Sequence, residues 1–294
     1  MDCISKKVKT AVLVTNTVKD RELEHFKKIY ELIKDNGAVV RVPILYKEML
    51  GERFDVTFCE ESQLYREADA AVVLGGDGTI LKAASGAIAE DCPLLGVNLG
   101  RIGYMAEIGK DETEQIKRLF EGRYKISERM TLHVSVEDGE MCRTVCENAL
   151  NDAVLRPASM GRVQALNVYS DGVRVSEHRG DGLIVSTPTG STAYSMSAGG
   201  PVFDPSLECM CVTPVCSLSP AARPIVFSAE CEIEIENADE NAGGVFLSCD
   251  GNEGMIVDKH ARIIVRRAQK KAKLISMGNE EFFNVLRKKI MSAM

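Results

Sequence analysis

The stretch Ala70-Ala71-Val72-Val73-Leu74-Gly75-Gly76-Asp77-Gly78-Thr79 joins an apolar run, a glycine-rich turn and the start of a helical pattern. An uninterrupted run of small and branched apolar residues is typical of a strand buried on both faces, as in parallel sheets. The glycines turn the chain, and an apolar helix is expected over residues 79–90. A strand that turns directly into a helix is the first part of a β-α-β unit, so the sequence predicts an α/β fold with a parallel sheet.

The segments on either side repeat this alternation. Residues 11–14, 38–42 and 93–97 are short apolar runs that predict further strands. Residues 20–34 predict a helix, with apolar side chains at helical spacing on one face: Leu23, Phe26, Tyr30 and Ile33. We therefore expect a doubly wound α/β domain over residues 1–122 that carries the Gly75–Thr79 loop.

The pattern changes after Gly122. Many short runs rich in Val, Ile, Leu and Thr follow, separated by Asp-Gly, Gly-Gly and Pro signals. This predicts a mainly antiparallel all-β domain over residues 123–274. Residues 280–291 are again helical in pattern, with apolar side chains on one face, and we expect this C-terminal helix, within residues 275–294, to pack back on the first domain.

Composition and charge exclude several classes of function. No apolar run approaches the roughly 18 residues of a membrane span, and the N-terminus lacks a signal-peptide pattern, so we expect a cytoplasmic protein. The net charge is −7, and the sequence shows no cluster of basic residues that could form a binding face for a nucleic acid, so a nucleic-acid partner is not expected. The ten cysteines are scattered, and their spacing favours free, mostly buried thiols over a metal site.

The glycine loop has the composition of an anion site. Gly75, Gly76, Gly78 and Thr79 stand between a strand and a helix N-terminus, where unpaired amides and the helix dipole favour a phosphate. Asp77 beside a phosphate is unfavourable unless it accepts a proton or holds a metal ion. The alternative is that Asp77 only caps the helix. The spacing fits neither a Walker loop nor a dinucleotide fingerprint, and Lys82 and Arg101 are candidate phosphate-binding cations.

Two polar segments of the second domain could bind a nucleoside. Asn151-Asp152 offers donors and acceptors that suit an adenine edge or ribose hydroxyls, although the pair could also be a simple turn. Residues 179–201 combine glycines, hydroxyls and Tyr194, which suits a polar ligand with a flat ring. Residues 248–254 predict a hairpin turn that could also contact a ligand.

In the order of these motifs the chain resembles the NAD kinase family over nearly its full length. The likeness is carried by the Gly75–Thr79 loop, by residues 94–107, by Asn151-Asp152 and by residues 182–201. The first of these alone is shared with diacylglycerol and sphingosine kinases. The resemblance implies an N-terminal α/β domain, a C-terminal β domain, and NAD bound in the cleft between them and the partner subunit of a homodimer or homotetramer.

The resemblance also implies an activity. ATP, or polyphosphate, would donate a phosphoryl group with Mg²⁺ or Mn²⁺ to the 2′-hydroxyl of the adenosine ribose, which gives NADP, and Asp77 matches the catalytic aspartate. The positions that match NAD contacts are Asp77, Gly78, Asn151, Asp152, Arg162, Arg179, Asp181, Thr192, Ala193, Tyr194, Ser197 and Asn252. Asn252 stands where many relatives carry a glutamine. The alternatives are a lipid kinase of the diacylglycerol type and a non-catalytic NAD(P)-binding sensor.

Overall fold

The computed structural model describes residues 6–100, 103–159, 163–238, 243–278 and 282–292. It divides into two compact units, Met1–Glu128 with Ala272–Met294, and Arg129–Lys271. The domain boundaries drawn from the sequence at residues 122 and 274 stay a prediction.

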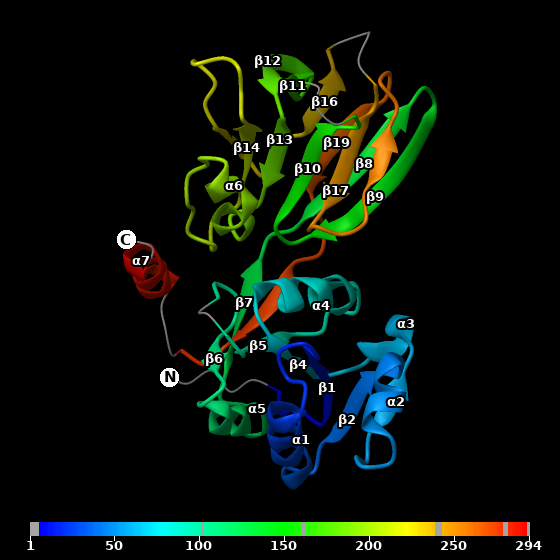
Figure 1. The fold of residues 1–294 in the computed structure, drawn as a ribbon, viewed down its shortest axis with the longest axis vertical. Helices are drawn as coiled ribbons and strands as arrows, with labels where there is room; N and C mark the ends of the chain where they lie inside the picture. The colour runs from blue at the N-terminus through cyan, green and yellow to red at the C-terminus, as the bar shows by residue number, and fades with distance from the viewer. Residues whose placement is uncertain (1–5, 101–102, 160–162, 239–242, 279–281, 293–294) are drawn as a thin grey trace. The chain divides into compact units, whose positions relative to one another are not determined.

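The first unit is built on an eight-stranded sheet (Figure 1). Its strands are β1 (Thr10–Thr15), β2 (Val39–Pro43), β3 (Thr57–Cys59), β4 (Ala70–Gly75), β5 (Leu94–Asn98), β6 (Ile108–Gly109), β7 (Lys125–Arg129) and β20 (Ala272–Ser276). The order is β3-β2-β1-β4-β5-β20-β7, with β6 paired to β5. The pairs from β3 to β20 are parallel, which confirms the predicted sheet.

The helices of this unit follow the strands. They are α1 (Glu24–Asp35), η1 (Ile44–Tyr46), α2 (Lys47–Leu50), α3 (Glu61–Leu64), α4 (Asp77–Ala89), η2 (Thr113–Ile116), α5 (Lys117–Glu121) and α7 (Phe282–Ser292). Helix α1 begins later than predicted because Leu23 takes a left-handed conformation with φ of 60°. Asp20 instead accepts the amide protons of His25 and Phe26, which ties the turn to the helix start. Helix α7 forms where predicted, and its Phe282 ring centroid lies 6.1 Å from that of Tyr104; its return to the first domain otherwise stays a prediction.

The strand order of the first unit creates a switch point. The chain passes from β1 to β2 and β3 on one side, and then returns to β4 on the other side of β1. In open parallel sheets the connections diverge at such a point and leave a crevice at the carboxyl ends of the two strands. The ends of β1 and β4 are therefore where a ligand site is expected.

The second unit is a sandwich of two six-stranded antiparallel sheets. One sheet holds β15 (Ile225–Ser228), β14 (Cys209–Val215), β13 (Gly182–Ser186), β10 (Asp152–Pro157), β17 (Val245–Cys249) and β18 (Met255–Val257). The other holds β12 (Val173–Gly180), β11 (Gln164–Ser170), β16 (Ile233–Asn237), β19 (Arg262–Arg267), β8 (Leu132–Asp138) and β9 (Met141–Ala149). Side chains of both sheets, such as Leu155 and Val265, share one core. This confirms the predicted antiparallel β fold.

The glycine-rich segment after β13 covers the outer face of its sheet. It contains η3 (Gly190–Thr192) and α6 (Tyr194–Ser197), and Figure 1 shows α6 beside β13. Tyr194 and Ala198 pack on Val154 and Ile184. Every residue of β13 is consequently buried, which explains why this strand reads as a continuous apolar run rather than an alternating one.

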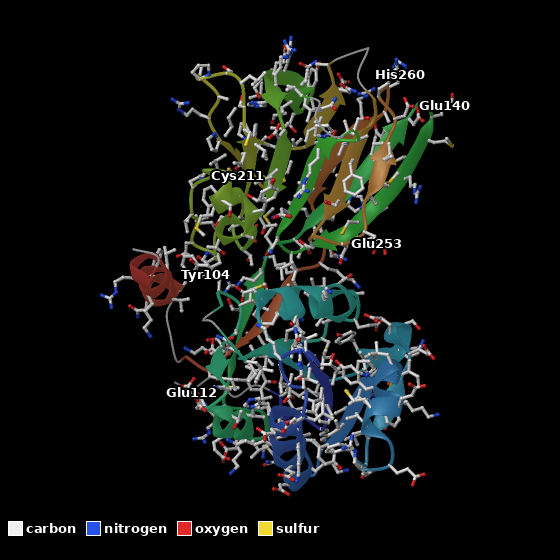
Figure 2. All side chains as sticks on the ribbon, in the orientation of Figure 1. Tyr104, Glu112, Glu140, Cys211, Glu253 and His260 are labelled. Atoms are coloured by element: carbon white, nitrogen blue, oxygen red, sulfur yellow. The ribbon has the colours of Figure 1, made fainter. Side chains whose placement is uncertain are left out.

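The cysteines are less buried than expected. All nine that the structure describes are free, but only Cys92, Cys211 and Cys249 are buried. Figure 2 labels Cys211, which lies in β14. Cys142 and Cys216 are exposed because they lie on β9 and just after β14, at the surface. In the described residues no helix combines the length and the apolar character that a membrane crossing requires.

Candidate active site

A cavity of about 980 Å³ opens at the switch point of the first unit. It is lined by the segment after β1, by the end of β2, by α3, and by the first turns of α4. Asp77, Gly78 and Thr79 line it, as does the predicted cation Lys82. The volume is within the range of roughly 300 to 1,000 Å³ that small-molecule sites occupy. The phosphate loop that the sequence predicted therefore borders a ligand-sized cavity.

Helix α4 starts earlier than predicted, at Asp77 rather than at Thr79. The carbonyl of Gly76 accepts the amide protons of Thr79 and Ile80, at 2.8 and 3.1 Å, and closes the first turn there. Asp77 and Gly78 thus belong to the first turn, where the helix dipole is positive. A Cβ on Gly75 would lie 2.4 Å from Thr79 Oγ1, so the close approach of the Thr79 side chain requires glycine at position 75.

Asn16, which is not among the residues predicted from the sequence, joins the ends of β1 and β4. Its side-chain nitrogen donates to Thr79 Oγ1 at 3.0 Å, and its backbone amide donates to Leu74 O at 2.8 Å. Its side-chain oxygen accepts the amide protons of Val18 and Lys19, each at 3.1 Å. One asparagine therefore fixes both the phosphate loop and the turn that carries Lys19. A polar residue two positions after the 11–14 run was the available signal.

Lys19 places a cation over the glycine segments. Its Nζ lies 3.2 Å from the position that a Cβ would take on Gly76, and the same distance from that on Gly100. A larger residue at either glycine would crowd the ammonium group. The cavity thus brings together the start of α4 and a positive charge, which is the chemistry a polyphosphate needs. Lys82 also lines the cavity, whereas Arg101 lies outside the described residues.

The carboxylate of Asp77 is held by a segment distant in sequence. Its Oδ2 accepts the amide proton of Tyr104 at 2.9 Å, and its Oδ1 accepts that of Met105 at 3.1 Å. A Cβ on Gly103 would lie 2.2 Å from Oδ1, so only glycine lets the chain pass this closely. Tyr104 is labelled in Figure 2. Burial raises the pKa of its phenol, and the negative charge of Asp77 raises this pKa further. A helix cap alone would not require this second segment.

In the second unit the half-buried Asp250 organises the Asn151-Asp152 segment. Asp250 Oδ2 accepts the amide proton of Leu150 at 2.7 Å, and Oδ1 accepts those of Asn151 and Asp152 at 2.7 and 3.1 Å. Burial raises the pKa of the Asp250 carboxyl, and the three amides act in the opposite direction. The hairpin turn predicted at residues 248–254 is present between β17 and β18, but this long-range role was not predicted.

The Asn151-Asp152 segment is joined to the glycine-rich segment. The carbonyl of Asn151 accepts the amide proton of Thr187 at 2.8 Å, and Thr187 Oγ1 donates to Leu150 O at 2.6 Å. A Cβ on Gly190 would lie 2.0 Å from the Asn151 carbonyl oxygen, so the two backbones touch there. The Asn151-Asp152 motif and the glycine-rich motif, which are separate in the sequence, are thus one structural unit.

The other predicted NAD-binding residues differ in exposure. Thr192, Ala193 and Tyr194 are half-buried next to Gly190, and the Arg156 guanidinium lies 5.4 Å from the centre of the Tyr194 ring. The exposed side chains are those of Arg179, Asp181, Ser197 and Asn252. Asn252 lies in the β17–β18 turn beside Glu253, labelled in Figure 2. The hydrogen bonds that join the two loops do not reach Arg179, Asp181 or Asn252 in the described chain, and Arg162 lies outside it.

The Asp152 carboxyl should make stability depend on pH. Burial raises its pKa to about 7, the nearby Asp250 adds to the rise, and Arg156 opposes it. An unfolded aspartate titrates near about 3.9, so the folded protein holds an extra proton between about pH 4 and 7. Stability is then lost as the pH rises through this window and is level above it. We expect the loss to be on the order of 2 to 4 kcal/mol.

Urea unfolding of the ligand-free protein between pH 4.5 and 8 checks this expectation. Asp152→Asn removes the titrating group but keeps a similar shape, so its stability should fall less with pH than that of the unmodified chain. Parallel pH curves for the two proteins would contradict the assignment.

Comparison with known proteins identifies the family. The ATP-NAD kinase N-terminal domain matches residues 3–124, and the ATP-NAD kinase C-terminal domain matches residues 150–277. The chain belongs to the NAD kinase family. This confirms the resemblance seen in the order of the motifs, and membership of the NAD kinase family makes the chain an enzyme of the phosphotransferase class.

Individual members of the NAD kinase family match over most of the chain. A NAD kinase of Lachnoclostridium phytofermentans is 33% identical over 287 residues, which is 96% of this chain and 99% of that protein. A NAD kinase of Geobacter metallireducens is 40% identical over 224 residues, 76% and 78% of the two chains. Among solved structures, an Archaeoglobus fulgidus NAD kinase in complex with ATP has a TM-score of 0.74 at 26% identity and covers 96% and 99%. Yeast NADH kinase complexed with NADH has the same fold, with a TM-score of 0.87 at 22% identity, covering 96% and 87%.

Proposed function

We propose that this chain transfers the γ-phosphoryl group of ATP to the 2′-hydroxyl of the adenosine ribose of NAD, with Asp77 as the general base. NAD kinase activity and ATP as donor follow from the family and from relatives named NAD kinase that match over nearly the whole chain. The observation that supports the role of Asp77 is its carboxylate, fixed by two backbone amides at the border of the cavity.

The chemistry needs positioning more than covalent assistance. A ribose hydroxyl is a weak nucleophile, so it must be aligned with the phosphorus and lose its proton late in the transfer. Asp77 would accept that proton. Because the amides of Tyr104 and Met105 hold the carboxylate, it needs no reorganisation during the reaction. The first-turn amides of α4 and the ammonium of Lys19 would offset the charge of the transferring group.

We propose that the second unit binds the dinucleotide. Asn151, Asp152 and Tyr194 supply an amide, a carboxylate and a ring within one joined pair of loops, which suits the edge and face of an adenine and the hydroxyls of its ribose. Thr192, Ala193 and Ser197 lie on the same segment. Arg179, Asp181 and Asn252 are proposed as further contacts, with exposed side chains that a ligand could reach.

A divalent metal is part of the proposal. Kinase sites usually bind Mg²⁺ through one or two carboxylates together with the substrate phosphates. Asp77 is a carboxylate beside the predicted phosphate loop, so the residues present fit such an ion. When bound, Mg²⁺ or Mn²⁺ would neutralise charge on the donor phosphates. We also propose, from the family likeness, a homodimer or homotetramer that acts in the cytoplasm.

An endpoint assay tests the function. The protein is incubated with NAD and Mg²⁺ together with ATP, with polyphosphate or with no donor, and NADP is measured with an NADP-specific dehydrogenase. We expect NADP with ATP and none without a donor; the polyphosphate arm determines the donor range. A parallel incubation of ATP with diacylglycerol should give no phosphatidate. Phosphatidate without NADP would support the lipid kinase, and NAD binding without turnover would support the sensor.

Lys19 should contribute mainly to binding of the donor. A charge-assisted hydrogen bond to a phosphate is worth about 1.5 to 3 kcal/mol, so Lys19→Ala should raise the KM for ATP roughly 10- to 100-fold. The KM for NAD should change little. Steady-state kinetics with each substrate varied in turn measures both constants. Lys28→Ala, on the exposed side of α1, is the matched control. An unchanged KM for ATP in Lys19→Ala would contradict the role.

A further inference from the structure

The cavity of the first unit has two ends of different chemistry. The polar end lies at β1, β4 and β5 and contains Asn16, Lys19 and the start of α4. The apolar end lies at β2 and α3, where the lining residues include Pro43, Leu45, Leu64 and Tyr65. Because β2 and β5 are three strand positions apart in the sheet, the two ends are separated by about 14 Å at the usual strand spacing.

We propose that the apolar end binds the base of the donor nucleotide, with Leu45 packed against it, so that the cavity recognises ATP as a nucleoside triphosphate and not only as a chain of phosphates. The proposal rests on the proposed function and names the donor subsite within it. It requires the triphosphate to run from the β2 side toward Lys19 and Asp77.

An exposed apolar side chain marks the rim of this end. Leu45 is 68% exposed and lines the cavity, whereas the other exposed apolar residue of the lining, Val18, belongs to the turn that carries Lys19. Single exposed apolar residues are common, but Leu45 borders a cavity whose floor is already apolar. Leu64 and Tyr65 are buried there. The flat face of a base would cover such a rim and remove it from water.

The floor is rigid and therefore suits a planar ligand. A Cβ on Gly86 of α4 would lie 2.7 Å from the Tyr65 ring, so this ring packs directly on the helix backbone. Tyr46 donates its hydroxyl proton to Thr15 O at 2.7 Å and accepts the Thr15 amide proton at 3.1 Å. Both tyrosines are thus fixed, and the end of β2 is tied to the end of β1, next to the polar end.

Charge sets the direction of the donor. Glu61 also lines the apolar end, at the start of α3. A carboxylate there disfavours a phosphate chain but can accept a hydrogen bond from an amino group or a ribose hydroxyl. Lys19 and Lys82 line the cavity together with the glycine loop. The two ends therefore favour opposite parts of a nucleotide, and the volume of about 980 Å³ leaves room for both.

The experiment replaces Leu45 by serine. The side chain is mostly exposed, so folding should be unaffected, and the loss of apolar contact with the base should raise the KM for ATP about 5- to 10-fold. The KM for NAD should stay the same. Inorganic tripolyphosphate, tested as a competitor of ATP, should inhibit Leu45→Ser and the unmodified enzyme with equal inhibition constants, because it has no base.

Val39→Ser is the matched control, since Val39 is 49% exposed at the opposite end of β2. It should leave the KM for ATP unchanged. The inference is overturned if Leu45→Ser binds ATP normally, or if it loses ATP and tripolyphosphate affinity equally, which would mean that phosphates occupy this end. Failure of the unmodified protein to make NADP would instead overturn the proposed function. Calorimetric titration with ATP measures the dissociation constant without turnover, so it tests the donor subsite independently of NADP formation.

Discussion

Replacing Asp77 by asparagine should lower kcat at least about 10²-fold while the dissociation constant for NAD stays within a few-fold. The amide keeps the shape of the side chain and can still accept a hydrogen bond, but it cannot take a proton from a ribose hydroxyl. A positioned base contributes about 10² to 10⁴-fold to such a transfer. Turnover is measured as NADP formed with saturating ATP and Mg²⁺, and NAD binding by calorimetry.

Glu112→Gln is a suitable control for this change. The Glu112 carboxylate also accepts a backbone amide proton, that of Gly109, at 2.8 Å in the same unit, but it is not among the residues that line the cavity. Figure 2 labels this residue. The control should keep near-normal turnover. Near-normal turnover in Asp77→Asn itself would refute the assignment of the base.

Gly103→Ala tests the same carboxylate through its position. The added methyl group would lie 2.2 Å from Asp77 Oδ1, so the carboxylate or the 103–105 segment must move. A displacement of this size at a reacting group can cost about 10²-fold. We therefore expect a fall in kcat in Gly103→Ala although Asp77 is still present.

The local pattern of the chain predicted most of the fold. The strands at β1, β2, β4 and β5 were placed within one or two residues, because buried apolar runs end at glycine or at polar residues. The assignment of strands to sheets was harder. β7 and β20 belong to the sheet of the first unit, although their sequences are short β-type runs like those of the second unit. The apolar pattern of a strand predicts that the strand is buried, but it does not identify the neighbouring strand with which it pairs.

The residues of the candidate site divide in the same way, into those with a local sequence signal and those whose role depends on long-range contacts. Asp77 and Asn151-Asp152 could be proposed from the sequence because each places a carboxylate or amide where the surrounding motif does not need one. Lys19 was missed because its place above Gly76 and Gly100 depends on the turn held by Asn16. Gly103 and Asp250 act on residues far along the chain. Such contacts become visible only when the strands are paired.

Among the substitutions proposed for this protein, Asp250→Ala should produce the largest loss of folding stability. The substitution removes the acceptor for the amides of Leu150, Asn151 and Asp152, which lie in a buried segment. An unsatisfied buried donor costs about 1 to 3 kcal/mol. Because burial also raises the pKa of the Asp250 carboxyl, losing the charge returns part of this cost. We expect the free energy of unfolding of the second unit to fall by about 3 to 5 kcal/mol, seen as an earlier urea transition by circular dichroism.

Asp171→Ala separates this effect from backbone strain. Asp171 and Asp250 both have positive φ, at 49° and 53°, and each precedes a glycine, so alanine meets the same conformational cost at either position. The Asp171 carboxylate, however, accepts one exposed amide proton, that of Glu232. Asp171→Ala should therefore cost about 1 kcal/mol or less. Equal losses in the two variants would show that the turn, and not the three amides, accounts for the effect. A larger loss in Asp250→Ala, together with weaker NAD binding, would mean that the Asp250 carboxylate shapes the nucleoside-binding segment.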